Sequence, residues 1–143
     1  MEVKFYDTVN DELLKFAVII SQSNGKWVFC KHKERDTYEV PGGHREAGED
    51  ILETAKRELQ EETGAVDFRI EPICVYSVKG KTRVNENIDD ETFGMLFIAD
   101  INSFEELHSE IEKILISDKL VENWTYPLIQ PILIEEAKKR GFI

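Results

Sequence analysis

The feature that most constrains this chain is an amphipathic helix predicted between residues 51 and 63. Asp50 and Glu53 form a capping-box pattern at its start. Thr63-Gly64 marks its end, because glycine readily adopts the left-handed conformation in which helices finish. Apolar side chains recur along it at helical spacing, at Ile51, Leu52, Ala55 and Leu59. One face of this helix must therefore pack against a core.

Strand signals lie on both sides of the helix. Residues 16–22 and 26–32 are apolar, β-branched runs separated by Asn24-Gly25, the pair favoured in type I′ turns, and they predict a β-hairpin. Tyr38 to Val40 is typical of a short strand, and Pro41-Gly42-Gly43 after it of a loop.

The second half of the chain continues the alternation. Strands are predicted around residues 68–78 and 92–101, and a closing helix over residues 131–140, with Pro131 in its first turn and Gly141 just past its end. Residues 103–116 fit either a helix or a loop with a short strand. Strands interrupted by helices predict the α/β (α+β) class, a mixed sheet with helices packed on it, in one domain over residues 1–143.

Composition excludes several classes of protein. The formal net charge of −11 opposes general binding to DNA or RNA, which are also negatively charged. No apolar run approaches the roughly 20 residues needed to span a membrane, and the N-terminus lacks a secretory signal, so a cytoplasmic protein is expected. Cys30 and Cys74 lie among apolar residues and are interpreted as reduced core thiols.

Three glutamates of the predicted helix converge. On a helical wheel Glu58 and Glu62 fall on or beside the apolar arc, and Glu61 on its flank. Carboxylates so placed need compensation, either from Arg57 or from Mg²⁺ or Mn²⁺, which favour oxygen ligands. A solvated acidic face with intrahelical ion pairs is the alternative, and the helix alone leaves both open.

The wider spacing resembles the signature of the Nudix hydrolase family, in which a glycine, a glutamate and an Arg-Glu-aliphatic-any-Glu-Glu-any-Gly run stand at fixed distances. All seven invariant letters are present, at Gly43, Glu49, Arg57, Glu58, Glu61, Glu62 and Gly64. The match covers residues 43–65, and Ala65 is smaller than the usual aliphatic residue at the last position.

The resemblance implies a Nudix-type α/β/α sandwich with a mixed sheet and a loop-helix-loop catalytic motif. It implies that Glu58 and Glu62 are the principal ligands of Mg²⁺ or Mn²⁺, with Glu61 a further ligand. It also implies that the backbone carbonyl of Gly42 is a further metal ligand. Glu58 or Glu61 would help to deprotonate the attacking water. Two further residues, Arg57 and Glu49, would hold these glutamates in place.

Substrate contacts must come from outside the signature. Lys31 and Arg35 are candidates for phosphate binding, with a solvated basic loop as the alternative. His44 lies beside the glycine loop, and Glu91 is a candidate extra acidic ligand or part of a solvated turn. The other histidines, His32 and His108, are expected at the surface. Finally, Trp124 and Tyr126 could stack on a base or cover the core.

The implied reaction is metal-dependent hydrolysis of a diphosphate linkage in a small nucleotide. The short flanks are most similar to the branch that cleaves nucleoside triphosphates, sometimes oxidised ones, to the monophosphate and pyrophosphate. The alternatives are an RNA 5′-pyrophosphohydrolase, a dinucleoside polyphosphate or nucleotide-sugar hydrolase, and a non-catalytic nucleotide-binding module. The resemblance also allows for a homodimer, although no interface can be identified in the sequence.

Overall fold

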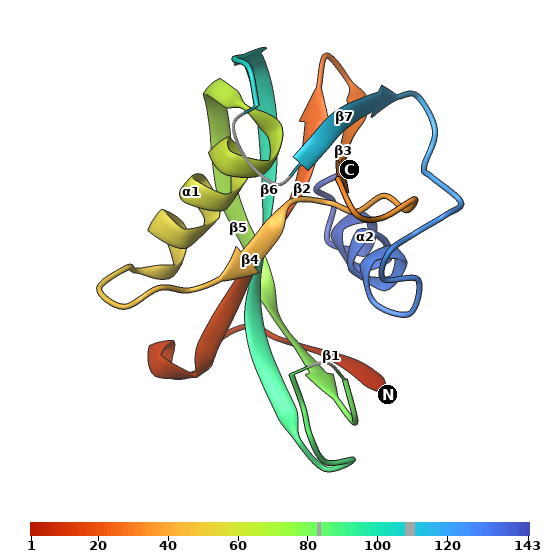
Figure 1. Ribbon diagram of the computed structural model, residues 1–143. Helices are drawn as coiled ribbons and strands as arrows, with labels where there is room; N and C mark the ends of the chain where they lie inside the picture. Colours follow the sequence, from red (N-terminus) through yellow and green to blue (C-terminus); the bar gives the residue numbers. More distant parts are fainter. Residues whose placement is uncertain (83, 108–110) are drawn as a thin grey trace.

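A mixed sheet between two helices organises the chain (Figure 1). The computed structural model describes residues 1–82, 84–107 and 111–143. Within these residues the strands are β1 (Glu2–Tyr6), β2 (Leu14–Ser23), β3 (Lys26–His32), β4 (Gly42–His44), β5 (Ala65–Lys79), β6 (Glu91–Phe104) and β7 (Ile111–Ser117). The helices there are α1 (Ile51–Thr63), α2 (Gln130–Lys139) and a single 3-10 turn, η1 (Asp11–Leu13).

The strands of the described residues follow the order β1-β5-β6-β2-β3-β7, with β4 paired to β2 outside this path. Strands β2 and β6 are parallel, and the other pairs are antiparallel. The sheet is therefore mixed, as the sequence predicts. In Figure 1 the long strands β5 and β6 run through the centre of the molecule, between α1 and α2.

The predicted hairpin is confirmed as β2 and β3. Asn24 and Gly25 between them have φ values of 52° and 77°. Both central residues of a type I′ turn need positive φ, which asparagine and glycine tolerate. The turn chemistry read from the sequence thus sets the register of the first two strands, in which Ser23 pairs with Lys26.

Helix α1 has the predicted boundaries. The Asp50 side chain accepts from the backbone N–H of Glu53 at 2.8 Å, and the Glu53 side chain accepts from that of Asp50 at 3.2 Å. Gly64 ends the helix with a φ of 77°. The apolar face of α1 is buried on one side of the sheet, against residues of β2 and β6 that include Ala17, Ile19, Phe97 and Ala99.

Helix α2 covers the opposite side of the sheet. Its Leu133, Ile134 and Ala137 are buried with Ile20 of β2 and Leu96 of β6. Alternate residues of β2 thus face different helices, because successive side chains of a strand point to opposite faces. The α/β/α layering and the fold class are confirmed.

The glycine segment differs from the prediction. Residues 38–40 form only isolated bridges, Tyr38 with Trp124 and Glu39 with Cys30, while the expected loop at Gly42 and Gly43 begins strand β4. The cause is close packing, since a Cβ on Gly42 would overlap the carbonyl of Ala17 in β2. A strand made possible by missing side chains carries no hydrophobic pattern.

Other elements were incomplete or absent in the prediction. Strand β1 at residues 2–6 was not anticipated, and the open segment 103–116 contains the end of β6 and strand β7. The closing helix begins one residue earlier than expected, at Gln130. Both cysteines are free and buried, as predicted. None of the helices in the described residues has the length and apolar character to cross a membrane.

Candidate active site

Two carboxylates of α1 rest on two adjacent glycines of β4. Glu62 Oε1 accepts from the backbone N–H of Gly42 at 2.7 Å. The Glu58 carboxyl lies over Gly43, where a Cβ would overlap it. Both glutamate side chains are 12% exposed. The strand that sequence alone could not predict is thus the surface on which the signature glutamates are held.

The pair carries unfavourable electrostatics. Burial, together with the negative charges of Glu62 and Glu61, raises the pKa of Glu58 to about 7. Arg57 opposes that rise, because its Nη1 donates to Glu58 Oε1 at 2.8 Å. Carboxylates that are held together despite burial and mutual repulsion are typical of an acid–base or metal centre.

Arg57 is the hub of the charged cluster. Its Nε and Nη2 donate to the two oxygens of Glu49, at 2.6 and 3.0 Å, and Nη2 also donates to the carbonyl of His44 at 2.9 Å. Its Nη1 reaches Glu61 at 3.4 Å, in addition to Glu58. These contacts lower the pKa of Glu49 to about 2, chiefly through the Arg57 hydrogen bonds. The guanidinium therefore ties the loop before α1, strand β4 and the glutamates into one unit.

A second charged group, formed by His32, Glu39 and Arg35, lies beside Glu62 and was not predicted from the sequence. Nε2 of His32 lies 3.1 Å from Glu39 and 3.3 Å from Glu62, and its side chain is 22% exposed. The hydrogen bond to Glu62 raises the pKa of His32, and burial raises that of Glu39. Arg35 Nη1 contacts Glu39 at 3.0 Å. His32 is thus an active-site neighbour, although a surface position was expected for it.

The sequence around Glu39 gives little indication that this carboxylate is buried beside His32 and Arg35. Glu39 stands between Tyr38 and Val40. Successive side chains of a strand point to opposite faces, so two apolar neighbours facing the core would leave the Glu39 carboxylate in solvent. Its 5% exposure accompanies contacts with His32, at the end of β3, and Arg35, on the turn between β3 and Glu39. His108, the third histidine, lies outside the described residues.

A cleft of about 790 Å³ opens beside the glutamates. Its walls come from β2, the β3–β4 segment, β5, the β5–β6 loop and the segment before α2. The lining includes Gly42, Gly43, His44 and Glu62. Apolar side chains such as Val18, Val78 and Leu133 also line it. The cleft thus joins a carboxylate site to a largely apolar chamber.

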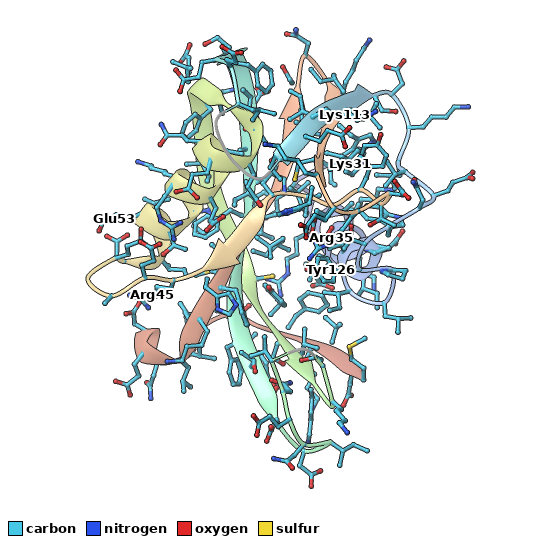
Figure 2. The ribbon with its side chains drawn as sticks, in the orientation of Figure 1. Lys31, Arg35, Arg45, Glu53, Lys113 and Tyr126 are labelled. Atoms are coloured by element: carbon cyan, nitrogen blue, oxygen red, sulfur yellow. The ribbon has the colours of Figure 1, made fainter. Side chains whose placement is uncertain are left out.

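Two of the four candidate substrate contacts line this cleft. Arg35 stands over the ring of Tyr126, with its guanidinium carbon 5.9 Å from the ring centroid, and Figure 2 shows the two side by side near α2. His44 packs against Phe16 with ring centroids 4.6 Å apart. By contrast, Trp124 packs edge-on against Phe29 in the core.

The structure does not bring the other two candidates to the cleft. Lys31 is paired with Glu112 of β7 and lies beside Lys113 in Figure 2. Glu91 accepts hydrogen bonds from Tyr6 at 2.7 Å and from Ser77 at 2.5 Å. Neither is among the lining residues of the cleft within the described part of the chain.

The acidic site fits a hard divalent cation by its donor chemistry. Glu58 and Glu62 offer carboxylate oxygens, and burial with the nearby negative charge of Glu62 raises the pKa of Glu58, which a cation would oppose. In the described residues, however, no three His, Cys, Asp or Glu side chains are already arranged to hold a metal. Arg57 and His32 occupy carboxylate oxygens instead.

Comparison with known proteins places the chain in a family. A family model described as a NUDIX domain matches residues 12–130, which is most of the chain. This chain belongs to the NUDIX domain family. The resemblance drawn from the signature residues is thereby confirmed, and the Nudix chain is a pyrophosphohydrolase by class.

Relatives of this Nudix chain extend over its full length. A Bacillus subtilis protein provisionally named 8-oxo-dGTP diphosphatase YtkD is 28% identical over 154 residues, covering 100% of this chain and 92% of its own. The crystal structure of a mutant Bacillus subtilis pyrophosphohydrolase superposes with a TM-score of 0.78 and 26% identity, covering 99% of this chain and 92% of that one.

A third comparison concerns the fold alone. A NUDIX hydrolase from Nitrosomonas europaea superposes with a TM-score of 0.69 and 21% identity, over 88% of this chain and 89% of that chain. The two superposed structures share the architecture described above.

Proposed function

We propose that this Nudix chain hydrolyses a nucleoside triphosphate, including oxidised forms, to the monophosphate and pyrophosphate. The observation that carries the proposal is that Glu62 and Gly43, over which the Glu58 carboxyl lies, line a cleft that is otherwise largely apolar. A carboxylate–metal site suits the phosphates, and an apolar chamber suits a nucleoside. The relatives named for 8-oxo-dGTP diphosphatase and pyrophosphohydrolase activity support this choice.

Divalent ions are general cofactors in this family, and we propose Mg²⁺ or Mn²⁺ here. Glu58 and Glu62 would be the main ligands, with Glu61 and the Gly42 carbonyl as further ones. A bound ion would neutralise phosphate oxygens and acidify a water molecule. The Glu61 side chain is 52% exposed, so it has room to act either as a metal ligand or as the base.

A carboxylate side chain of the protein would take the proton from the attacking water. Water adds to one phosphorus, the bridging P–O bond breaks towards the departing pyrophosphate or nucleoside monophosphate, and a carboxylate accepts the proton that the water loses. Glu58 or Glu61 is the proposed base. Arg57 and Glu49 hold these side chains in position.

Two side chains on the cleft wall would orient the phosphates. Arg35 and His44 both line the cleft, and we propose that they contact the phosphate chain beyond the metal site. Part of the Arg35 charge is already offset by Glu39. This partial neutralisation favours a positioning contact over a strong electrostatic one.

The test is a product-release screen with and without Mg²⁺ and Mn²⁺. Its arms are ordinary and 8-oxo nucleoside triphosphates, triphosphorylated RNA, dinucleoside polyphosphates and nucleotide sugars. We expect metal-dependent pyrophosphate release from triphosphates, abolished by Glu62→Gln. Preferred turnover of RNA 5′ ends or of another arm would overturn the substrate. Silence in every arm from folded protein would replace catalysis with a binding role.

A further inference from the structure

Four buried polar side chains line the cleft within the described residues. They are Glu39, Tyr76, Asn85 and Gln130, each at most 5% exposed. A polar group buried to this extent normally has a hydrogen-bond partner, because leaving it without one costs free energy. Whether each group is already satisfied therefore indicates whether it is structural or free to meet a ligand.

Two of the four are saturated by the fold. Asn85 donates from Nδ2 to the carbonyls of Val78 at 2.9 Å and Asp90 at 3.1 Å, and its Oδ1 accepts from the Thr92 hydroxyl. The Glu39 carboxylate is engaged by His32 and by Arg35, as described above. Asn85 fastens the loop between β5 and β6 and has no hydrogen atom left for a ligand.

Gln130 is only half satisfied. Its Oε1 accepts from the backbone N–H of Val40 at 2.9 Å, which fixes the orientation of the amide. The amide nitrogen then carries two hydrogens for which the described residues provide no acceptor. Such a group can only donate, so its partner must be an acceptor atom.

Tyr76 has a free hydroxyl. The ring lies across Gly94 of the neighbouring strand, where a Cβ would come within 2.7 Å of the ring edge. Among the described residues nothing hydrogen-bonds to the hydroxyl, and burial alone raises its pKa. The phenol is consequently neutral at physiological pH and can donate or accept.

Both free groups are accessible from the cleft. No fully enclosed side-chain nitrogen or oxygen of the described residues lacks a partner. The unpartnered hydroxyl of Tyr76 and amide nitrogen of Gln130 are therefore not sealed in the core. The two residues line the same cleft, so its apolar part contains two uncommitted hydrogen-bonding groups.

We propose that Tyr76 and Gln130 recognise the base of the nucleotide by hydrogen bonding to an acceptor on its edge, a ring carbonyl oxygen. This inference rests on the proposed function, and it identifies the base as the part of the substrate that the apolar chamber binds. The neighbouring Val18, Val78 and Leu133 suit a flat, uncharged base. A phosphate would instead favour the cationic and metal-binding end of the cleft.

The test compares inosine triphosphate with purine riboside triphosphate, which lacks the 6-oxygen and with it the hydrogen on N1. Tyr76→Phe keeps the ring over Gly94 and removes only the hydroxyl. Gln130→Glu keeps an acceptor for the Val40 N–H and replaces the donor by an oxygen that repels a carbonyl. Tyr6→Phe is the matched control, since the Tyr6 hydroxyl bonds Glu91 away from the cleft.

We expect the wild type to favour inosine triphosphate in kcat/KM, mainly through KM. Each cleft variant should lower that preference by roughly 3- to 10-fold, the effect of one hydrogen bond. The control should keep the wild-type preference. An unchanged preference in both cleft variants, or an equal loss for both nucleotides, would overturn the proposal.

A failure of the proposed function would look different. If wild-type protein hydrolyses neither nucleotide, titration calorimetry of the same two compounds still measures binding. Preferential binding of inosine triphosphate that Tyr76→Phe and Gln130→Glu weaken would support base recognition without catalysis. Equal affinities of the wild type for the two compounds would overturn it.

Discussion

Arg57 donates to both carboxylate oxygens of Glu49, through Nε at 2.6 Å and Nη2 at 3.0 Å. This paired contact links the loop before α1 to the helix that carries the glutamates. The same guanidinium contacts Glu58 and the carbonyl of His44. The positions of the Glu49 and Glu58 carboxylates therefore depend on a planar group with several fixed donors.

Arg57→Lys should lower kcat by roughly 10- to 100-fold, because an ammonium cannot reproduce the forked contacts. Glu49→Gln should have a similar effect, and the double variant should be little worse than either. Steady-state kinetics on all three variants measures this coupling. Arg69→Lys, in an 84% exposed side chain, is the control. Fully additive losses would show that the two residues act separately.

Gly43→Ala should destabilise the protein by about 1–3 kcal/mol, because the new methyl group would overlap the Glu58 carboxyl. Glu58→Asp shortens that side chain, so in its background Gly43→Ala should cost less. Denaturant unfolding of the two single variants and the double variant tests this. Equal costs in both backgrounds would mean that the Glu58 carboxyl does not limit the space at Gly43.

Mg²⁺ or Mn²⁺ should stabilise the wild-type protein. At a concentration 100-fold above its Kd, a ligand adds about 2.7 kcal/mol. For a domain of this size that raises Tm by roughly 5–10 °C. Thermal unfolding with a chelator and with each metal measures the shift. Glu62→Gln should lose most of it while remaining folded, and an undiminished shift in that variant would exclude Glu62 as a main ligand.

His32→Ala should raise the metal concentration needed for half-maximal activity by about 10-fold, because His32 holds Glu62 and Glu39 together. His32→Gln retains a donor and should recover part of the loss. Metal titrations of activity separate this role from substrate contact. A raised KM for the nucleotide with unchanged metal dependence would instead indicate that His32 touches substrate.

The stability that Glu91 provides should depend on pH. Hydrogen bonds from Ser77 and Tyr6 hold the pKa of this carboxyl below its usual range. Its stabilising effect is therefore complete above the unfolded value of about 4.3 and is lost as pH falls through the lower folded value. Unfolding of wild type and Tyr6→Phe should differ most above the unfolded value and converge as the pH falls below the folded one. A difference independent of pH would contradict this linkage.

Local chemistry determined a large part of the fold. The capping residues and Gly64 set both ends of α1, and Asn24-Gly25 set the first hairpin, because these signals act within a few residues. The spacing of the signature residues also predicted that Glu58 and Glu62 lie together, since a helix brings residues four apart onto one face.

Only the tertiary structure decided what surrounds these glutamates. Gly42 and Gly43 form a strand because β2 lies against them, and His32 meets Glu39 and Glu62 because β3 ends beside α1. The Gln130 amide oxygen bonds the backbone N–H of Val40, which is 90 residues away in the chain, so the uncommitted amide nitrogen also depends on tertiary packing. Contacts between residues far apart in the chain depend on packing, and a sequence pattern records only the local part of that packing.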